Sequence, residues 1–352
     1  MARCLRIESA GAFYHVMARG NLRQTIFHDE EDHLFFLRTL ADGCERTGWR
    51  VHAWVLMSNH YHLFLETPEP NLVAGMSWLQ NAFTRRYNVR HRAWGRVFGD
   101  RYKSVIVDGE DRYHYHTLMD YIHLNPVRAR LVQPNEGQSV LDYRWSSVAG
   151  GYALPPKRRP KWLAATAGLK AFELADTAAG RRKMVERLDR RAVEEEASQC
   201  GVPMLPEEVD ARVSHLRRGW YWGSQAFGEK MAKLAQRLIR GKGKPRSRGY
   251  RAEVHVRRHD ERETQRWLEE GLTGAGLRRA ELERLPGSDP RKVLIAERLW
   301  RETVVSQGWL AEKLRMKSAA NVSQQVRRLD REKALAKVSD ELRQWLKEGG
   351  GR

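Results

Sequence analysis

The chain has 352 residues, of which 41% are hydrophobic and 30% are charged, and its formal net charge is +19. This composition suits two or three helix-rich domains, and the absence of any run of about eighteen apolar residues excludes a membrane-spanning segment. Met1 is followed by no apolar signal region, and the three scattered cysteines show neither disulfide nor zinc-finger spacing. A cytoplasmic protein in a reducing environment is therefore expected.

Positive charge is concentrated in the later part of the chain. Residues 1–150 contain 18 Lys and Arg against 16 Asp and Glu, whereas the remaining 202 residues contain 45 against 28. This distribution predicts a polyanionic partner, and nucleic acid is favoured over a membrane because no amphipathic anchor is evident. The alternative is a basic helical surface that is only solvated. We expect a nucleoid-associated protein with DNA, and no membrane, as its partner.

Strand and helix patterns alternate through the first 150 residues. Helices are predicted from Asp29, from Asn71 and from Asp111, and strands at 13–19, 51–57, from His60 onward and up to Val107. The helix from Asp29 should stop near Gly43 or Gly48, the helix from Asn71 near Arg90, and the helix from Asp111 near Arg128. The two-residue Ser58-Asn59 link predicts an antiparallel hairpin between the second and third strands.

His60 and His62 begin the third predicted strand. Because side chains alternate between the faces of a strand, the two imidazoles should project from the same face. Imidazole is the commonest metal ligand among side chains, so this pair is a candidate half of a metal site. The alternative is that one histidine is a hydrogen-bonded core residue and the other lies beside it by accident.

The third predicted helix carries Tyr121 and Asn125 four residues apart, and so on one face. Pro126 should remove a hydrogen bond and bend the helix. If this helix packs across the sheet face that carries His60 and His62, two nitrogens and an amide oxygen could bind Mg²⁺ or Mn²⁺. Such an ion would polarise a phosphate that the Tyr121 phenol attacks, giving a covalent phosphotyrosine.

These residues resemble the HUH single-tyrosine transposases, and especially the REP-associated tyrosine transposases. The resemblance covers about residues 1–150 and is carried, in order, by Tyr14-His15-Val16, Arg19-Gly20, Ile26-Phe27, His60-Tyr61-His62, Gly99 to Ser104, Asp120 to Ala129 and Tyr143 to Ser147. It implies a ferredoxin-like α+β domain with an antiparallel sheet. It also implies that His60 and His62 bind the metal, that Tyr121 is the nucleophile and that Asn125 is the third ligand.

Two positions depart from the usual pattern of this family. The middle residue of its histidine motif is usually aliphatic and is Tyr61 here, which should point to the opposite face. Asn125 stands where more distant relatives have Gln, and its shorter side chain reduces its reach.

Two other groupings of metal-ligand residues occur in the same region. His114 and His116 lie in the third predicted helix, where they point about 200° apart, so a shared ion is not expected. His60, His62 and Glu66 imitate the two-histidine, one-carboxylate set of cupin-like oxygenases. The chain lacks the many regular strands of such a barrel, and its basic charge would serve no small substrate.

Two groups of basic, aromatic and amide residues are candidate DNA contacts. Arg101, Tyr102 and Lys103 suit phosphates and stacked bases, with a protected strand edge as the alternative. Near the end of the chain, three short predicted helices between 290 and 330 resemble a helix-turn-helix, with a three-helix core as the alternative. Its last helix would present Gln324, Gln325, Arg327 and Arg328 to DNA, although Arg315 occupies a turn position that usually holds Gly.

The region between is predicted to be mostly helical. A Pro- and cation-rich linker is expected at 153–161, helices from 162 to about 236, and a flexible basic tether at 241–249. The charges of 181–196 are interpreted as surface pairs along a helix. The aromatic cluster at 219–224 is interpreted as part of a small core in preference to a platform for unpaired bases.

Together these observations predict an α+β N-terminal domain followed by a mostly α-helical region. The expected domains are 1–150 (transposase or nuclease), 151–240 (helical), 241–285 (basic linker and helical segment) and 286–335 (helix-turn-helix-like). The predicted activity is metal-dependent cleavage and rejoining of single-stranded DNA, with hairpin-containing repeats as candidate targets. A non-catalytic DNA-binding regulator on the same fold is the alternative, and both a monomer and a homodimer are compatible with the sequence.

Overall fold

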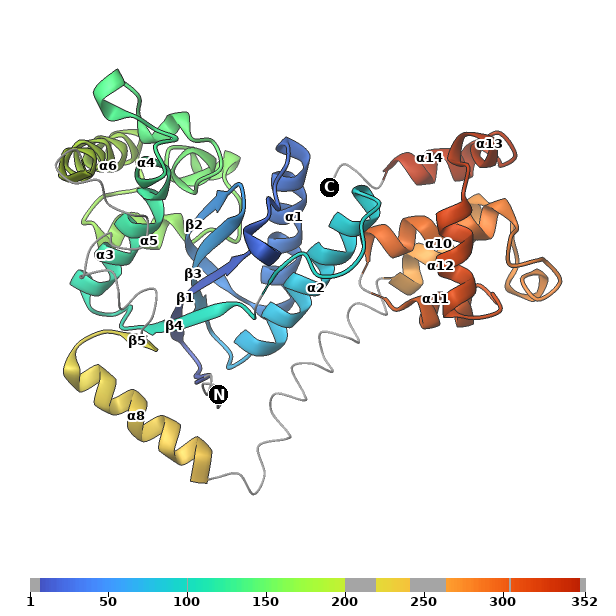
Figure 1. Cartoon of the computed structure of the whole chain (residues 1–352), viewed down its shortest axis with the longest axis horizontal. Helices are drawn as coiled ribbons and strands as arrows, with labels where there is room; N and C mark the ends of the chain where they lie inside the picture. Colours follow the sequence, from blue (N-terminus) through green and yellow to red (C-terminus); the bar gives the residue numbers. More distant parts are fainter. Residues whose placement is uncertain (1–6, 100, 200–219, 241–263, 304, 349–352) are drawn as a thin grey trace. The chain divides into compact units, whose positions relative to one another are not determined.

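The computed structural model of the chain describes residues 7–99, 101–199, 220–240, 264–303 and 305–348 and divides into two compact units (Figure 1). The first unit comprises residues 1–80 and 95–250, and the second comprises residues 81–94 and 251–352. In the described part of the chain, no helix is both long and apolar enough to cross a membrane.

The first unit is built on a five-stranded sheet with the order β2-β3-β1-β4-β5. Its strands are β1 (Ala12–Arg19), β2 (Arg50–Met57), β3 (His60–Thr67), β4 (Lys103–Val107) and β5 (Tyr221–Trp222). With α1 (Glu30–Thr47) after β1 and α2 (Leu72–Arg90) after β3, the first four strands form the predicted ferredoxin-like antiparallel arrangement. β5 adds a parallel edge to β4, so the complete sheet is mixed.

The predicted ends of α1 are confirmed by its caps. The Asp29 carboxylate accepts a hydrogen bond from the backbone N–H of Asp32 at 3.0 Å, which satisfies one of the free donors of the first turn. At the other end Gly48 adopts φ +72°, a left-handed conformation that glycine adopts without steric cost. Gly43 lies inside the helix, so of the two predicted stops the second is the one used.

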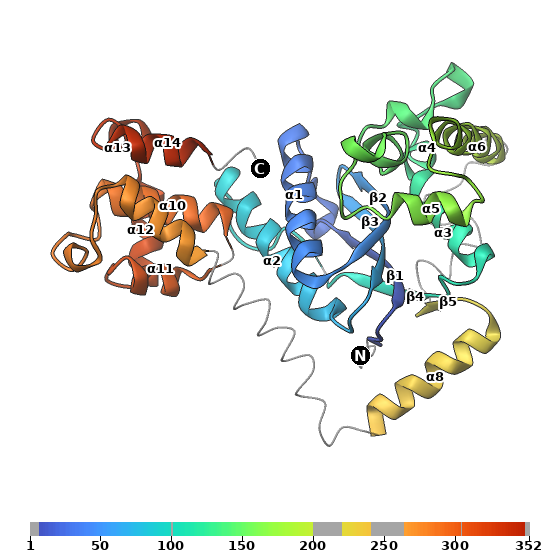
Figure 2. The same ribbon diagram turned by 180° about the vertical axis from the view of Figure 1, so that it is seen from behind.

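The two faces of the sheet are covered by different helices (Figures 1 and 2). Tyr61 points to the face covered by α1, where its ring centroid lies 4.6 Å from that of Phe36. The Tyr61 side chain is therefore on the face opposite to His60 and His62, as predicted. On the other face, the His52 Nδ1 lies 2.7 Å from the hydroxyl of Tyr115 in α3 (Arg112–His123).

The predicted third helix is two helices, because α3 ends at His123 and α4 (Asn125–Arg128) follows after Leu124. The sequence predicted one helix with a bend at Pro126. This prediction was wrong, because the helix breaks at Leu124, two residues earlier. Pro126 lies in the first turn of α4, where a backbone N–H has no partner in the helix and its loss costs nothing. The break therefore precedes the proline and falls three residues after Tyr121.

Residues 151–199 pack as part of the first unit, so residue 150, where the predicted N-terminal domain ends, lies inside this unit. They contain α5 (Ala165–Ala171) and α6 (Ala178–Gln199). The predicted linker at 153–161 was wrong: the Arg159 side chain is only 6% exposed and pairs with Asp176 at 2.6 Å. Directly after it, the carbonyl of Trp162 accepts from the N–H of Val51 in β2. Of the cations that suggested a solvated segment, Arg159 is paired within the unit, whereas Lys157, Arg158 and Lys161 are exposed.

Short helical turns complete the connections in the first unit. They are Asn21–Arg23, Pro134–Glu136, Val140–Asp142, Val148–Tyr152 and Pro156–Arg158. The predicted aromatic cluster supplies β5, and the Trp222 indole N–H donates to the carbonyl of His114 at 3.3 Å. After β5 comes α8 (Gln225–Arg240). The predicted basic tether at 241–249 lies outside the described residues.

The second unit is helical in its described part. It contains α10 (Pro290–Glu302), α11 (Gln307–Lys313), α12 (Ala319–Arg328), α13 (Arg331–Leu335) and α14 (Asp340–Glu348), with a short turn at Arg279–Glu281. Its apolar core draws residues from Leu268 to Leu346. Between α11 and α12, Arg315 has φ +51°, which is the conformation that favours glycine at this kind of turn. The buried Lys292 Nζ donates to three carbonyls, including that of Arg315 at 3.1 Å, and holds the turn.

Candidate active site

Three histidines gather on the sheet face that α3 covers. His60 and His62 lie on β3 with their ring centroids 5.2 Å apart, and His15 lies on the neighbouring β1. Met17 is directly opposite His62 in the antiparallel register, so His15 is its diagonal neighbour. The rings of His15 and His62 stack with centroids 5.1 Å apart and an angle of 18° between their planes.

Each of the two predicted metal ligands has its Nδ1 engaged by a neighbouring side chain. His60 Nδ1 lies 2.7 Å from Asn59 Oδ1, and His62 Nδ1 lies 2.9 Å from His15 Nε2. The Asn59 amide nitrogen donates to the carbonyl of Arg23 at 3.1 Å, which leaves its oxygen to accept from His60. Metal-binding histidines usually donate their other ring nitrogen in this way, which fixes the tautomer and the ring plane. A metal ion would therefore bind both rings through Nε2.

Tyr121 lies against these histidines from the last turn of α3. Its ring meets that of His15 at 5.5 Å and that of His62 at 5.6 Å, edge-on in both cases. The Tyr121 side chain is 2% exposed, because α3 presents a continuous apolar face to the sheet with Tyr115, Leu118 and Ile122. The structure thus brings the predicted nucleophile and both predicted ligands together within one chain.

Asn125 lies at the start of α4 and bonds to the backbone of α3. Its Nδ2 donates to the carbonyl of Tyr121 at 2.7 Å and to that of Ile122 at 3.4 Å. Because the amide nitrogen faces these carbonyls, the amide oxygen faces away from them. The Asn125 side chain is buried, and its contacts here are with the helix that carries Tyr121.

The family of the N-terminal part is given by comparison with known proteins. Residues 9–125 match the family model described as "Transposase IS200 like". This range contains the three histidines, Tyr121 and Asn125. Residues 9–125 form a transposase domain of the IS200-like family. The resemblance drawn from the motifs is thereby confirmed.

One solved structure similar to the chain is titled "Structure of the REP associates tyrosine transposase bound to a REP hairpin". It is 17% identical to this chain, and the match covers 42% of this chain and 82% of that one, with a TM-score of 0.36. None of the curated proteins matches the chain.

The alternative ligand set with Glu66 is not assembled in the transposase domain. Glu66 lies four residues beyond His62, about 13 Å along the strand at ~3.3 Å per residue. It accepts instead from His52 Nε2 at 3.2 Å and from Arg50 at 3.0 Å. The hydrogen bond from His52 is the main reason that the pKa of Glu66 lies below its usual value. Among the described residues, no three His, Cys, Asp or Glu side chains form a metal-binding group.

His114 and His116 turn to separate partners, as their helical spacing predicts. His114 Nδ1 lies 2.7 Å from the Asp111 carboxylate. His116 Nε2 lies 2.8 Å from the carbonyl of Ala171, and its ring stacks on Phe172 with centroids 3.9 Å apart.

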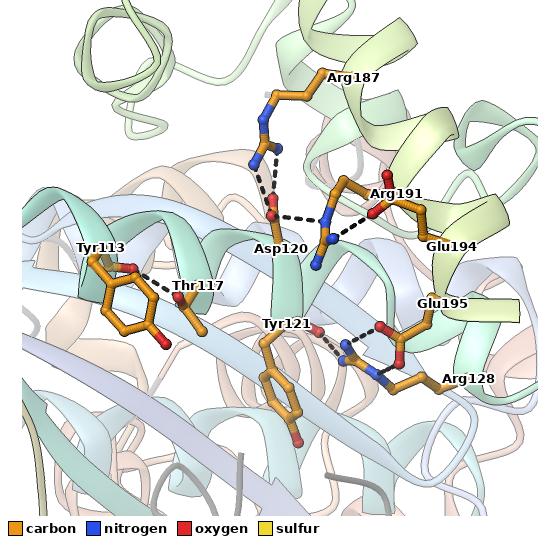
Figure 3. Close-up of polar contacts among 9 residues, drawn as sticks. All are labelled: Tyr113, Thr117, Asp120, Tyr121, Arg128, Arg187, Arg191, Glu194 and Glu195. Carbon is orange, nitrogen blue, oxygen red and sulfur yellow. Dashed lines mark hydrogen bonds and ion pairs between the residues drawn. The ribbon is translucent and has the colours of Figure 1, made fainter. Parts of the chain in front are cut away.

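α3, which carries Tyr121, and the following α4 are each tied to α6 of the same unit by a two-bond ion pair (Figure 3). Asp120 accepts both terminal nitrogens of Arg187, at 2.6 and 2.7 Å. Asp120 of α3 also pairs with Arg191 of α6 at 3.6 Å. One turn beyond the break, Arg128 makes a similar two-bond pair with Glu195, at 2.6 and 3.0 Å. Sequence analysis missed both pairs, because charges of both signs along α6 are equally typical of a solvated helix.

The predicted DNA-contacting residues of the transposase domain differ in accessibility. Arg101 and Lys103 are exposed at the start of β4, where phosphates could reach them. Tyr102 is only 5% exposed, so its ring faces are covered by protein in this conformation.

The corresponding residues of α12 belong to the second unit. Gln324, Arg327 and Arg328 are exposed and Gln325 is half-buried. The Arg327 guanidinium lies 5.4 Å from the ring centroid of Trp94, which is 73% exposed. Sequence analysis did not single out Trp94, because nothing local links position 94 to α12.

Proposed function

We propose that this protein is a single-tyrosine DNA transposase of the HUH type, which cleaves and rejoins single-stranded DNA through a covalent phosphotyrosine. The observation that carries the proposal is the edge-on contact of the Tyr121 ring with His15 and His62 inside a domain of the IS200-like family. A buried tyrosine beside paired imidazoles is an arrangement suited to nucleophilic attack next to a bound cation.

The residues present fit a divalent metal ion. His60 and His62 share one sheet face, and the contacts of their Nδ1 atoms direct Nε2 to a ligand. The amide oxygen of Asn125 is the third proposed ligand, and nitrogen and oxygen donors together suit Mn²⁺ or Mg²⁺. When bound, such an ion supplies Lewis-acid polarisation of the scissile phosphate.

The chain's own residues then perform one balanced exchange at phosphorus. The Tyr121 phenol oxygen forms a bond to phosphorus, and the bond from phosphorus to the sugar oxygen of the other strand end breaks. The phenolic proton leaves to solvent, and the departing sugar oxygen takes up a proton and becomes a free hydroxyl. Because the phosphodiester is exchanged for a phosphotyrosine ester, the reverse attack by a hydroxyl rejoins the strand without ATP.

The remainder of the chain is proposed to hold DNA. Residues 151–352 carry most of the net positive charge, and α12 presents Gln324, Arg327 and Arg328 on an exposed surface. Arginine and glutamine there are suited to phosphates and to base edges. Arg101 and Lys103 are the proposed phosphate contacts of the transposase domain, and hairpin-containing repeats remain the candidate targets.

The deciding experiment compares the wild-type chain with Tyr121→Phe and with Tyr113→Phe. Tyr113 lies two turns earlier on the same helix and is 61% exposed, so its variant is a matched loss of one hydroxyl. Each protein is incubated with circular single-stranded phage DNA and Mg²⁺ or Mn²⁺, and linear DNA and detergent-resistant protein–DNA adducts are measured.

We expect wild type and Tyr113→Phe to form adducts, and Tyr121→Phe to form none while still binding DNA. Adduct formation by Tyr121→Phe would remove this residue from the reaction. Binding without cleavage by the wild-type chain would instead favour a non-catalytic DNA-binding regulator.

A further inference from the structure

Arg128 contacts both the ring and the backbone of Tyr121 and is paired with Glu195 of α6; its hydrogen bonds are drawn in Figure 3. Its guanidinium carbon lies 4.9 Å from the centroid of the Tyr121 ring. Its Nη1 donates to the Tyr121 carbonyl at 2.9 Å. Its Nε and Nη2 donate to the two carboxylate oxygens of Glu195. One planar cation thus contacts the ring and the backbone of Tyr121 while it is bound to α6.

The break between α3 and α4 makes these contacts possible. The carbonyl of Tyr121 lies in the last turn of α3, where carbonyls lack partners within the helix. It accepts instead from the side chains of Asn125 and Arg128, at 2.7 and 2.9 Å. In an unbroken helix the same carbonyl would bond to the backbone N–H four residues later. The break therefore lets two side chains of α4 hold the backbone of Tyr121.

Glu195 fixes the position of the guanidinium. The pair is bidentate, and both side chains are largely buried, at 11% exposure for Arg128 and 16% for Glu195. A two-bond arginine–carboxylate pair has one preferred plane, so it orients the guanidinium as well as neutralising it. The plane and position of the cation beside the Tyr121 ring are thus set by a residue of α6.

We propose that Arg128 is a positioning residue for the Tyr121 phenol, and that Glu195 of α6 holds Arg128 in place. This inference rests on the proposed function, because positioning matters only if Tyr121 is the nucleophile. An attacking oxygen must be held close to its target phosphorus, and a misplacement of about 1 Å can cost on the order of 100-fold in rate. The cation beside the ring and the bond to the backbone together restrict where the phenol oxygen points.

The two-bond ion pair between α6 and α3 provides a matched control. Arg187 and Asp120 also form a two-bond pair between α6 and α3, but no contact of Arg187 is with the Tyr121 ring. Arg187→Gln therefore weakens the attachment of α6 and leaves Arg128 in place. A purely structural role for Arg128 predicts that Arg128→Gln and Arg187→Gln behave alike.

A charge exchange separates the ion pair from the contact with the ring. The double variant Arg128→Glu with Glu195→Arg can restore the attraction between α4 and α6. Position 128 then carries a carboxylate. The cation that α4 placed beside the Tyr121 ring is lost, and so is the hydrogen bond from residue 128 to the Tyr121 carbonyl. Positioning by Arg128 therefore predicts recovered stability without recovered rate.

The test uses the full chain, circular single-stranded phage DNA and Mn²⁺. We measure the single-turnover rate constant for adduct formation, the DNA dissociation constant and the thermal unfolding midpoint. We expect Arg128→Gln to lower the rate constant by about 10- to 100-fold with little change in DNA affinity. Glu195→Gln should give a smaller loss, and Arg187→Gln should lower the unfolding midpoint while its rate constant stays within about threefold of wild type.

A second readout does not depend on catalysis. 3-Fluorotyrosine incorporated at position 121 gives a ¹⁹F resonance that reports on the surroundings of the ring. It should shift more in Arg128→Gln than in Arg187→Gln. Equal shifts and equal rate losses in the two variants, or recovery of the rate by the charge exchange, would overturn the inference. If wild type forms no adduct but the resonance responds as expected, the proposed function fails while the orientation of Tyr121 by Arg128 stands.

Discussion

The ring of Tyr121 lies edge-on to the ring of His62, with 5.6 Å between the centroids and 86° between the planes. Both residues belong to the same chain, and the helix that carries Tyr121 packs directly on the strand that carries His62. Tyr121 therefore lies beside the histidines of its own chain.

The first prediction is that the active site works in cis. Tyr121→Phe lacks the proposed nucleophile, and the double variant His60→Ala with His62→Ala lacks the proposed ligands. A mixture of these two proteins should form no more adduct than either one alone, since neither chain contains a complete site. The control is wild type mixed with one of the two variants, at the same total protein concentration as the mixture of variants. Restored adduct formation in the mixture would mean that the tyrosine of one chain serves the histidines of another.

The second prediction concerns the neighbours of His60 and His62, the proposed metal ligands. Asn59→Ala removes the acceptor for His60 Nδ1, and His15→Phe removes the partner of His62 Nδ1. Each change should weaken Mn²⁺ binding by about 10- to 100-fold, because the ring planes and tautomers are no longer fixed. Binding is measured by electron paramagnetic resonance of free Mn²⁺ without DNA.

His116→Gln is the matched control for these two variants, because it removes an imidazole that stacks on Phe172 away from β3. Its Mn²⁺ affinity should equal that of wild type. Unchanged affinity in both Asn59→Ala and His15→Phe would show that neither residue orients the ligands.

The third prediction is a pH dependence of stability from Glu66. The hydrogen bond from His52 keeps the pKa of Glu66 below its ordinary value, so the folded state holds the carboxylate ionised more readily than the unfolded state does. Its stabilisation is fully present above the ordinary glutamate pKa of about 4.3 and is lost as the pH falls through the lower, folded value. Glu66→Gln should therefore lower the free energy of unfolding near neutral pH by about 1 kcal/mol.

Urea unfolding of wild type and Glu66→Gln is followed by circular dichroism near neutral pH and at successively lower pH. The difference between them should shrink as the pH falls below the ordinary pKa of glutamate. The same substitution at the exposed Glu110 should have little effect at any pH. A difference that stays constant with pH would mean that the charge of Glu66 contributes nothing.

Much of the fold could be predicted because the signals are local. Asp29 marks the start of α1, and Gly43 and Gly48 were its two candidate ends, through capping preferences that act within one turn. Ser58-Asn59 marks a hairpin through its length alone. The shared face of His60 and His62 follows from the alternation of side chains along a single strand. None of these features depends on which distant segment packs against them.

The features that were missed depend on register and on packing between distant segments. His15 reaches His62 only because β1 and β3 pair with Met17 opposite His62, which the sequence does not specify. Arg128 and Glu195 are far apart in the chain, and each has several residues of opposite charge closer to it in sequence. The buried Arg159 was taken for part of a solvated linker because its partner Asp176 follows only after an intervening helix.

The last prediction concerns α12 and the exposed Trp94 beside it. Arg327 lies over the Trp94 ring, so an exposed cation and an exposed aromatic face form one continuous surface in the second unit. Such a surface suits a phosphate and a stacked base together. Arg327→Gln should weaken DNA binding and reduce the slope of log affinity against log salt by about 1, as expected when one phosphate contact is lost. Trp94→Ala should weaken binding with little change in that slope, because stacking releases no counterion.

Binding is measured by fluorescence anisotropy with a labelled single-stranded oligonucleotide and with the same sequence as a duplex, over a series of salt concentrations. Arg343→Gln on α14 is the control, since that arginine is paired with Asp340 and bonded to the carbonyl of Leu335 within the same unit. A larger effect of Trp94→Ala on the single strand than on the duplex would indicate stacking on an unpaired base. If Arg327→Gln, like the control Arg343→Gln, leaves the affinity and the salt slope of wild type unchanged, α12 is not a DNA-binding surface. The three helices α10, α11 and α12 would then serve only the core of the second unit.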